Sequence, residues 1–140
     1  MQTKRVPADH VVVHVAAHVA APKAIEDLAD DDIAALYDEP VRAALSALQQ
    51  GRAGGATRFV FVIPSLGERG AAGQAATCAA AEAVRVLALS AARQWNDEGV
   101  TVNCISVESS DDDIAPIVAL LTGGSVSGET LRLGGPPPGV

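Results

Sequence analysis

Residues 58–65, with the sequence RFVFVIPS, form a run of bulky apolar side chains that ends at Pro64. A continuous apolar run of this length is typical of a strand buried on both faces, as in parallel sheets. A glycine-rich loop at 67–73, a long helical pattern over 75–95 and a further strand pattern at 101–106 follow it. Strand, helix and strand in this order predict a βαβ unit.

The same alternation continues toward both ends of the chain. It adds strands at 11–17 and 130–133, a helix that runs to about Gln50 with an interruption at Pro40, and a helix that starts at Asp111–Asp113. Right-handed crossovers between parallel strands are then expected. The pattern predicts one α/β domain over residues 1–135, a truncated Rossmann-like three-layer sandwich with a parallel sheet of about four strands. A Pro-rich C-terminal tail occupies 136–140.

Charge and composition narrow the class of protein. The chain has 17 Asp and Glu against 10 Lys and Arg, a formal net charge of −7, which argues against nucleic acid or anionic membrane as partners. No apolar run of 18 residues predicts a membrane span, and the N-terminus makes a poor signal peptide. Cys78 and Cys104 have no metal-ligand spacing and suit a reducing compartment, so we expect a cytoplasmic protein.

Histidines at positions 10, 14 and 18 recur every fourth residue. On a helix they would form a stripe that could hold zinc. The surrounding valines favour a strand, in which case the histidines are polar groups near a sheet edge. We therefore predict no metal site.

Several segments resemble the later half of the short-chain dehydrogenase/reductase family, over about residues 9–135. The matching segments, in the order of the family, are His14–Ala17 at its Asn-Asn-Ala-Gly motif, Ser65 at its catalytic serine, Gly73–Val84 at the stretch of its Tyr-x-x-x-Lys motif, Gly99–Ile105 at its next strand and Ser127–Gly135 at its C-terminal glycine-rich strand. The resemblance implies a truncated, catalytically degenerate relative of nicotinamide-dependent oxidoreductases.

The departures from the family concern its active site. In the family, tyrosine is the general acid, lysine lowers its pKa and binds the nicotinamide ribose, serine steadies the substrate and asparagine completes a proton relay. Counted from Ser65, the tyrosine position falls at Cys78, the lysine position at Glu82 and the asparagine position at about Pro40. Glu82 would oppose ionisation of Cys78. These four positions are therefore interpreted as vestigial.

A nicotinamide dinucleotide needs a glycine-rich turn between its first strand and a helix. No residues before Val11 can form such a unit, so we expect no cofactor. The outer edge of the strand at 11–17 would also need a cover, either from residues 2–9 or from a partner chain.

The helix at 75–95 is apolar on all sides, which predicts that a partner covers the face turned away from the sheet. In the resembled family, this helix and the preceding one pair subunits. The predicted interface residues are Ala79, Ala80, Ala83, Val84, Leu87 and Ala91.

The leading hypothesis is a non-catalytic subunit that associates through its long helices with a full-length NAD(P)-dependent reductase, as a heterodimer or heterotetramer. Two alternatives stay open. One is an enzyme with altered chemistry at Ser65 and Cys78, and the other is a structural homodimer without a catalytic partner.

Overall fold

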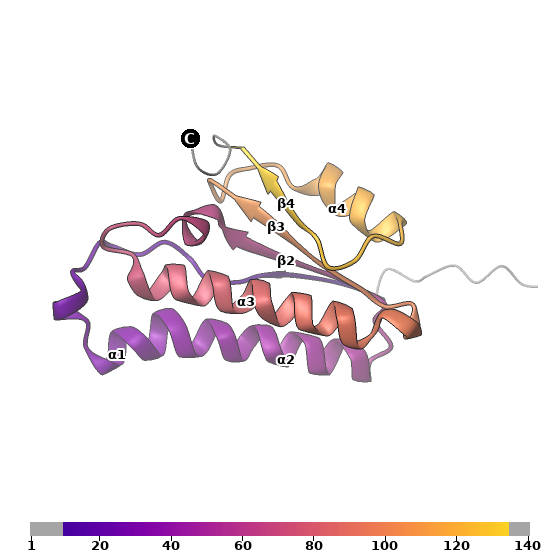
Figure 1. The fold of residues 1–140 in the computed structure, drawn as a ribbon, viewed down its shortest axis with the longest axis horizontal. Coiled ribbons are helices and arrows are strands. Elements are labelled where there is room, and N and C mark those ends of the chain that lie inside the picture. The colour runs from indigo at the N-terminus through magenta and orange to yellow at the C-terminus, as the bar shows by residue number, and fades with distance from the viewer. Residues whose placement is uncertain (1–9, 135–140) are drawn as a thin grey trace, which may run out of the picture.

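The computed structural model describes residues 10–134, which form four parallel strands between two helical layers (Figure 1). The strands are β1 (Val11–Val15), β2 (Arg58–Pro64), β3 (Thr101–Val107) and β4 (Thr130–Leu133). The helices are α1 (Asp30–Ile33), α2 (Glu39–Ala53), α3 (Ala75–Gln94) and α4 (Ala115–Gly123), with a π-helical segment η3 (Ala34–Asp38) and short 3-10 turns η2 (Ile25–Asp27), η4 (Ser65–Glu68) and η5 (Asn96–Glu98). The predicted α/β class and four-stranded parallel sheet are confirmed.

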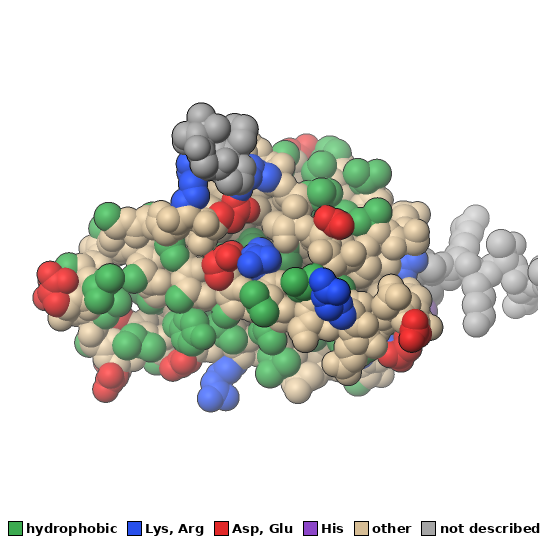
Figure 2. Space-filling model, viewed as in Figure 1, with side chains coloured by type: hydrophobic (Ala, Val, Ile, Leu, Met, Phe, Trp, Pro, Cys, Tyr) green, Lys and Arg blue, Asp and Glu red, His purple; other side chains and the backbone are tan. Residues whose placement is uncertain are grey.

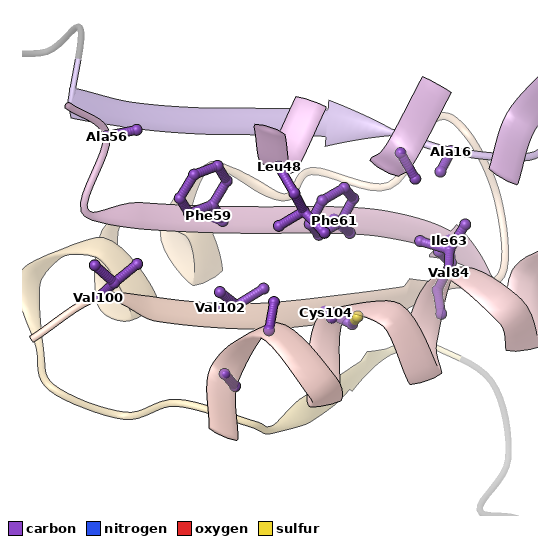
Figure 3. Close-up of a cluster of buried hydrophobic side chains, with 14 of the residues drawn as sticks. Ala16, Leu48, Ala56, Phe59, Phe61, Ile63, Val84, Val100, Val102 and Cys104 are labelled. Atoms are coloured by element: carbon purple, nitrogen blue, oxygen red, sulfur yellow. The ribbon is translucent and has the colours of Figure 1, made fainter. Parts of the chain in front are cut away.

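Side chains on the two faces of the sheet pack against different helices. Phe59 and Phe61 of β2 are buried on the face covered by α2 and α3, where Val84 joins them (Figure 3). Val60, the residue between the two phenylalanines, points to the opposite face and packs near Leu121 of α4. The consecutive apolar residues 59–63 of β2 are therefore explained by a sheet that is covered on both faces.

The three crossover connections do not all have the same hand. The strand order β1-β2-β3-β4 advances in one direction, so crossovers of one hand would place every helix on the same face. The helices α2 and α3 lie on one face of the sheet and α4 on the other (Figure 1). The expectation that every crossover is right-handed is thus wrong for at least one of them.

Two helix boundaries differ from the sequence prediction. Pro40 does not interrupt a helix, because it is the second residue of α2. Proline has no backbone N–H to donate, and the π-helical segment η3, which directly precedes α2, accommodates the loss of that hydrogen bond. The last helix begins at Ala115 and not at Asp111–Asp113, because the Asp112 carboxylate accepts the N–H groups of the preceding loop instead.

Of the three histidines, only His14 lies in a strand, β1, as the valines around it indicate, while His10 directly precedes β1 and His18 lies in the segment after it. His14 lies in β1 with its ring edge-on to Phe61, at 5.7 Å between centroids. No group of metal-ligating side chains occurs among residues 10–134. Residues 2–9, considered as a cover for the β1 edge, and the predicted tail at 136–140 both lie outside the described residues.

Candidate functional site

Ser65 and Cys78, the serine and tyrosine positions of the resemblance, belong to neighbouring elements. Ser65 is half-buried and opens η4 at the end of β2, and Cys78 is buried in the first turn of α3. The Cys78 thiol donates a hydrogen bond to the Leu66 carbonyl oxygen, with 3.6 Å between Sγ and O. Among the described residues, this thiol makes no hydrogen bond with a cation or an imidazole, the groups that activate a cysteine.

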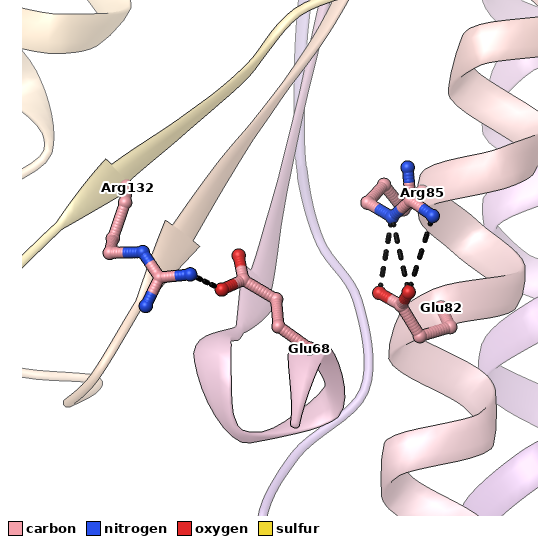
Figure 4. A network of polar contacts seen from close by, with 4 residues as sticks. All are labelled: Glu68, Glu82, Arg85 and Arg132. Carbon is pink, nitrogen blue, oxygen red and sulfur yellow. Dashed lines mark hydrogen bonds and ion pairs between the residues drawn. The ribbon is translucent and has the colours of Figure 1, made fainter. Parts of the chain in front are cut away.

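Glu82, at the lysine position, lies one helical turn beyond Cys78. Its carboxylate accepts hydrogen bonds from Arg85 of the same helix, with 3.1 Å between Arg85 Nε and Glu82 Oε2 (Figure 4). Both side chains are about one-third exposed. The position that holds the ribose-binding lysine in the family therefore carries an ion pair within α3. Pro40, at the asparagine position, offers no side-chain donor or acceptor for a proton relay.

A second ion pair, between Glu68 of η4 and Arg132 of β4, was not expected from the sequence (Figure 4). Both side chains are about four-fifths buried, with 17% and 20% of their surface exposed. This pair fastens the turn that follows Ser65 to the last strand. Sequence reasoning missed it because the partners are far apart in the chain and share no local pattern.

The segment that leaves β1 is bonded to the beginning of α3. Thr77 Oγ1 donates to the His18 carbonyl oxygen at 3.0 Å, and the Gln74 amide exchanges two hydrogen bonds with the Ala20 backbone, at 2.6 and 3.3 Å. A Cβ added to Gly73 would lie 2.8 Å from Pro22. The N-terminus of α3 is thus covered by protein and is closed to an anion.

A hollow of about 580 Å³ lies at the carboxyl ends of β1, β2 and β3, next to the first turn of α4. In open α/β sheets, ligands bind at this edge. The vestigial positions 40, 65, 78 and 82 do not line it. The lining residues are Val15, Ala17, His18, Val19, Val62, Ile63, Pro64, Val107, Glu108, Ser109, Ser110, Asp112 and Ile114. The only available sequence signal for the hollow was that these residues follow strand ends.

The predicted interface residues divide into two groups. Ala79 is exposed and Ala83 and Leu87 are half-buried, so these three are accessible to another chain. Ala80 and Val84 are 0% exposed and Ala91 is 8% exposed, so their assignment to an interface is corrected: the rest of the described chain already covers them.

An exposed valine on the same helix was not among the predicted interface residues. Val86 is 53% exposed, although it lies on a helix that was expected to be covered on all sides. Because α3 is apolar all round, its sequence does not show which side chains face the sheet.

On length and composition alone, α3 could cross a membrane. Nine of its residues are buried, and it packs on β2 and β3 as the central helix of a globular fold does.

No family model and no curated protein matches the chain. Its fold matches that of solved structures. One is a short-chain dehydrogenase from Burkholderia cenocepacia in complex with NADP, with a TM-score of 0.72 and 22% identity, covering 88% of this chain and 63% of the dehydrogenase. Another is a blue fluorescent protein from a metagenomic library in complex with NADPH, with a TM-score of 0.76 and 22% identity, covering 89% and 63%.

The chain therefore has the fold expected from the resemblance and spans under two-thirds of the length of these two proteins. Both of them bind a nicotinamide dinucleotide, but the residues described here do not fit that group. The charged side chains that line the hollow, Glu108 and Asp112, are acidic, and an acid, Glu82, also stands where the resemblance would place the family's ribose-binding lysine. The one N-terminus that opens a helix behind a glycine-rich loop, that of α3, is covered. The lining of the hollow, as described, offers phosphate groups no lysine or arginine.

Proposed function

We propose that the chain is a non-catalytic subunit that associates through α2 and α3 with a full-length NAD(P)-dependent reductase of the same fold. It would stabilise or modulate that enzyme in a heterodimer or a 2:2 heterotetramer. The observation that carries the proposal is the apolar outer surface of the helical layer. Hydrophobic side chains gather over α1, α2 and α3 (Figure 2). The large exposed ones on this layer are Ile33, Leu45 and Val86, at 40%, 42% and 53% exposure.

Part of this surface lies on α3, the helix that also carries the altered positions 78 and 82. Cys78 is bonded to a backbone carbonyl and Glu82 to Arg85, so α3 supplies neither an activated acid nor a ribose-binding cation. Two of its accessible residues, Ala79 and Ala83, are small and apolar, which allows another helix to approach closely at that point. We infer that α3 serves association in place of proton transfer.

A reductase of the same fold is the proposed partner because it presents the matching helix pair. The backbone likeness to two dehydrogenase-type structures, at TM-scores of 0.72 and 0.76, supports an α2–α3 arrangement like that of the family, in which these helices pair subunits. Covering each half-exposed aliphatic side chain would contribute about 1 kcal/mol, half the value for full burial. Three such residues and the alanines around them would give a modest but specific contact.

Co-expression with the full-length reductase encoded nearest to this gene tests the proposal. Val86→Asp places a charge on the outer face of α3 and should abolish co-purification. Leu120→Asp is the matched control, because Leu120 is 67% exposed on α4 in the opposite layer. It should leave co-purification intact. Equal behaviour of the two variants contradicts the proposal, as does a chain that forms only homodimers beside the reductase.

A further inference from the structure

The lining of the hollow suggests what it can bind. Its walls are aliphatic, with Val15, Val62 and Val107 from three successive strands, while its rim carries the carboxylates of Glu108 and Asp112. The lining contains no lysine or arginine among the described residues, and its one basic side chain is the imidazole of His18. We propose that this hollow binds a small apolar molecule with a cationic amino group, such as an arylalkylamine, and rejects nicotinamide dinucleotides.

Of the two carboxylates, that of Asp112 also holds the loop by hydrogen bonds and that of Glu108 does not, so Glu108 is the residue to substitute. Asp112 Oδ2 accepts the backbone N–H groups of Glu108 and Ser109, at 3.2 and 3.1 Å, and so shapes the loop between β3 and α4. In contrast, Glu108 takes part in these hydrogen bonds only through its backbone, and its side chain is exposed. Glu108→Gln therefore removes a charge from the rim with little effect on the loop.

The selectivity follows from charge and burial. An apolar body that displaces water from the valine walls gains hydrophobic free energy whatever its charge. An ammonium group at the rim gains an ion pair, and a carboxylate or phosphate at the same place is repelled. With both carboxylates at a partly exposed rim, the amine should bind about fivefold more tightly than the neutral alcohol of the same shape.

The test is a titration of the full chain at pH 8, followed through the NMR signals of its valine methyl groups. The probes are 2-phenylethylamine, 2-phenylethanol, 3-phenylpropionate and NADP⁺. We expect the amine to shift the hollow's valine signals with a dissociation constant about fivefold lower than the alcohol's. The propionate and NADP⁺ should leave these signals unchanged.

Glu108→Gln should reduce the preference for amine over alcohol to about twofold, because only Asp112 remains. The matched control is Asp97→Asn, which removes an exposed acid on η5 and should keep the full preference. Equal affinity for amine and alcohol in the unaltered chain overturns the proposal. So does an unchanged preference in Glu108→Gln, or NADP⁺ binding in the hollow. Because no reductase is present in this experiment, its outcome is independent of the proposed association.

Discussion

Replacement of Ala17 by glycine should stabilise the fold. Ala17 follows β1 with a φ of +62°, the only positive φ of a non-glycine residue in the described part of the chain. It occupies the place of the glycine in the Asn-Asn-Ala-Gly motif of the resemblance. An alanine in the left-handed region is strained by about 1–2 kcal/mol, because its Cβ approaches the backbone carbonyl oxygen. Glycine has no such strain but loses about 0.5–1 kcal/mol more backbone entropy on folding.

The difference predicts that Ala17→Gly raises the free energy of unfolding by about 0.5–1 kcal/mol. The assay is urea unfolding followed by far-UV circular dichroism. Ala24 provides the control: it is exposed and has an ordinary φ of −64°, so Ala24→Gly should lower the free energy of unfolding by about 0.5–1 kcal/mol. If both variants lose stability equally, the strain assigned to Ala17 is refuted.

Two further predictions concern Cys104 and the ion pairs. Burial raises the pKa of the Cys104 thiol from 9.0 to about 12. The neutral thiol therefore contributes fully to the stability of the fold below pH 9. This contribution is lost between pH 9 and pH 12, by about 1.4 kcal/mol for each pH unit. In urea unfolding measured from pH 8 to 10.5, the free energy of unfolding of Cys104→Ala should therefore fall less steeply with pH than that of the unaltered chain. The same fall in both proteins would contradict the prediction. Glu68→Gln should cost about 1–2 kcal/mol, because the pair with Arg132 is mostly buried, and Glu82→Gln less than about 0.5 kcal/mol, because the pair with Arg85 is screened by water. Equal losses in thermal unfolding would argue against that ranking.

The strand β2 could be predicted because it is buried on both faces and is therefore apolar at consecutive positions from Phe59 to Ile63. In contrast, β3 is also buried but includes the polar residues Asn103 and Ser106. Helix boundaries were harder to predict, because local side-chain bonds compete with the helix. Asp112 accepts N–H groups of the preceding loop, and the last helix starts only at Ala115. Helices on both faces of the sheet were predicted as a three-layer sandwich, but the hand of every crossover was not predicted correctly, because the sequence does not indicate which face a given helix covers.

The candidate site was only partly predictable. Spacing from Ser65 located Cys78 and Glu82, but not their partners Leu66 and Arg85, because these depend on side-chain orientation. The hollow and the Glu68–Arg132 pair arise from segments that meet only in the folded chain. Likewise, when apolar residues lie all round a helix, the sequence does not indicate which side of the helix faces the sheet. Val86 could therefore not be distinguished from the buried residues of α3 before the fold was known.

Native mass spectrometry of the chain co-expressed with the neighbouring full-length reductase tests the central claim most directly. The account predicts an intact assembly containing equal numbers of both polypeptides, as a 1:1 or 2:2 species, which disappears with Val86→Asp. Spectra showing only separate species, with the reductase paired to itself and this chain alone or self-paired, would contradict it.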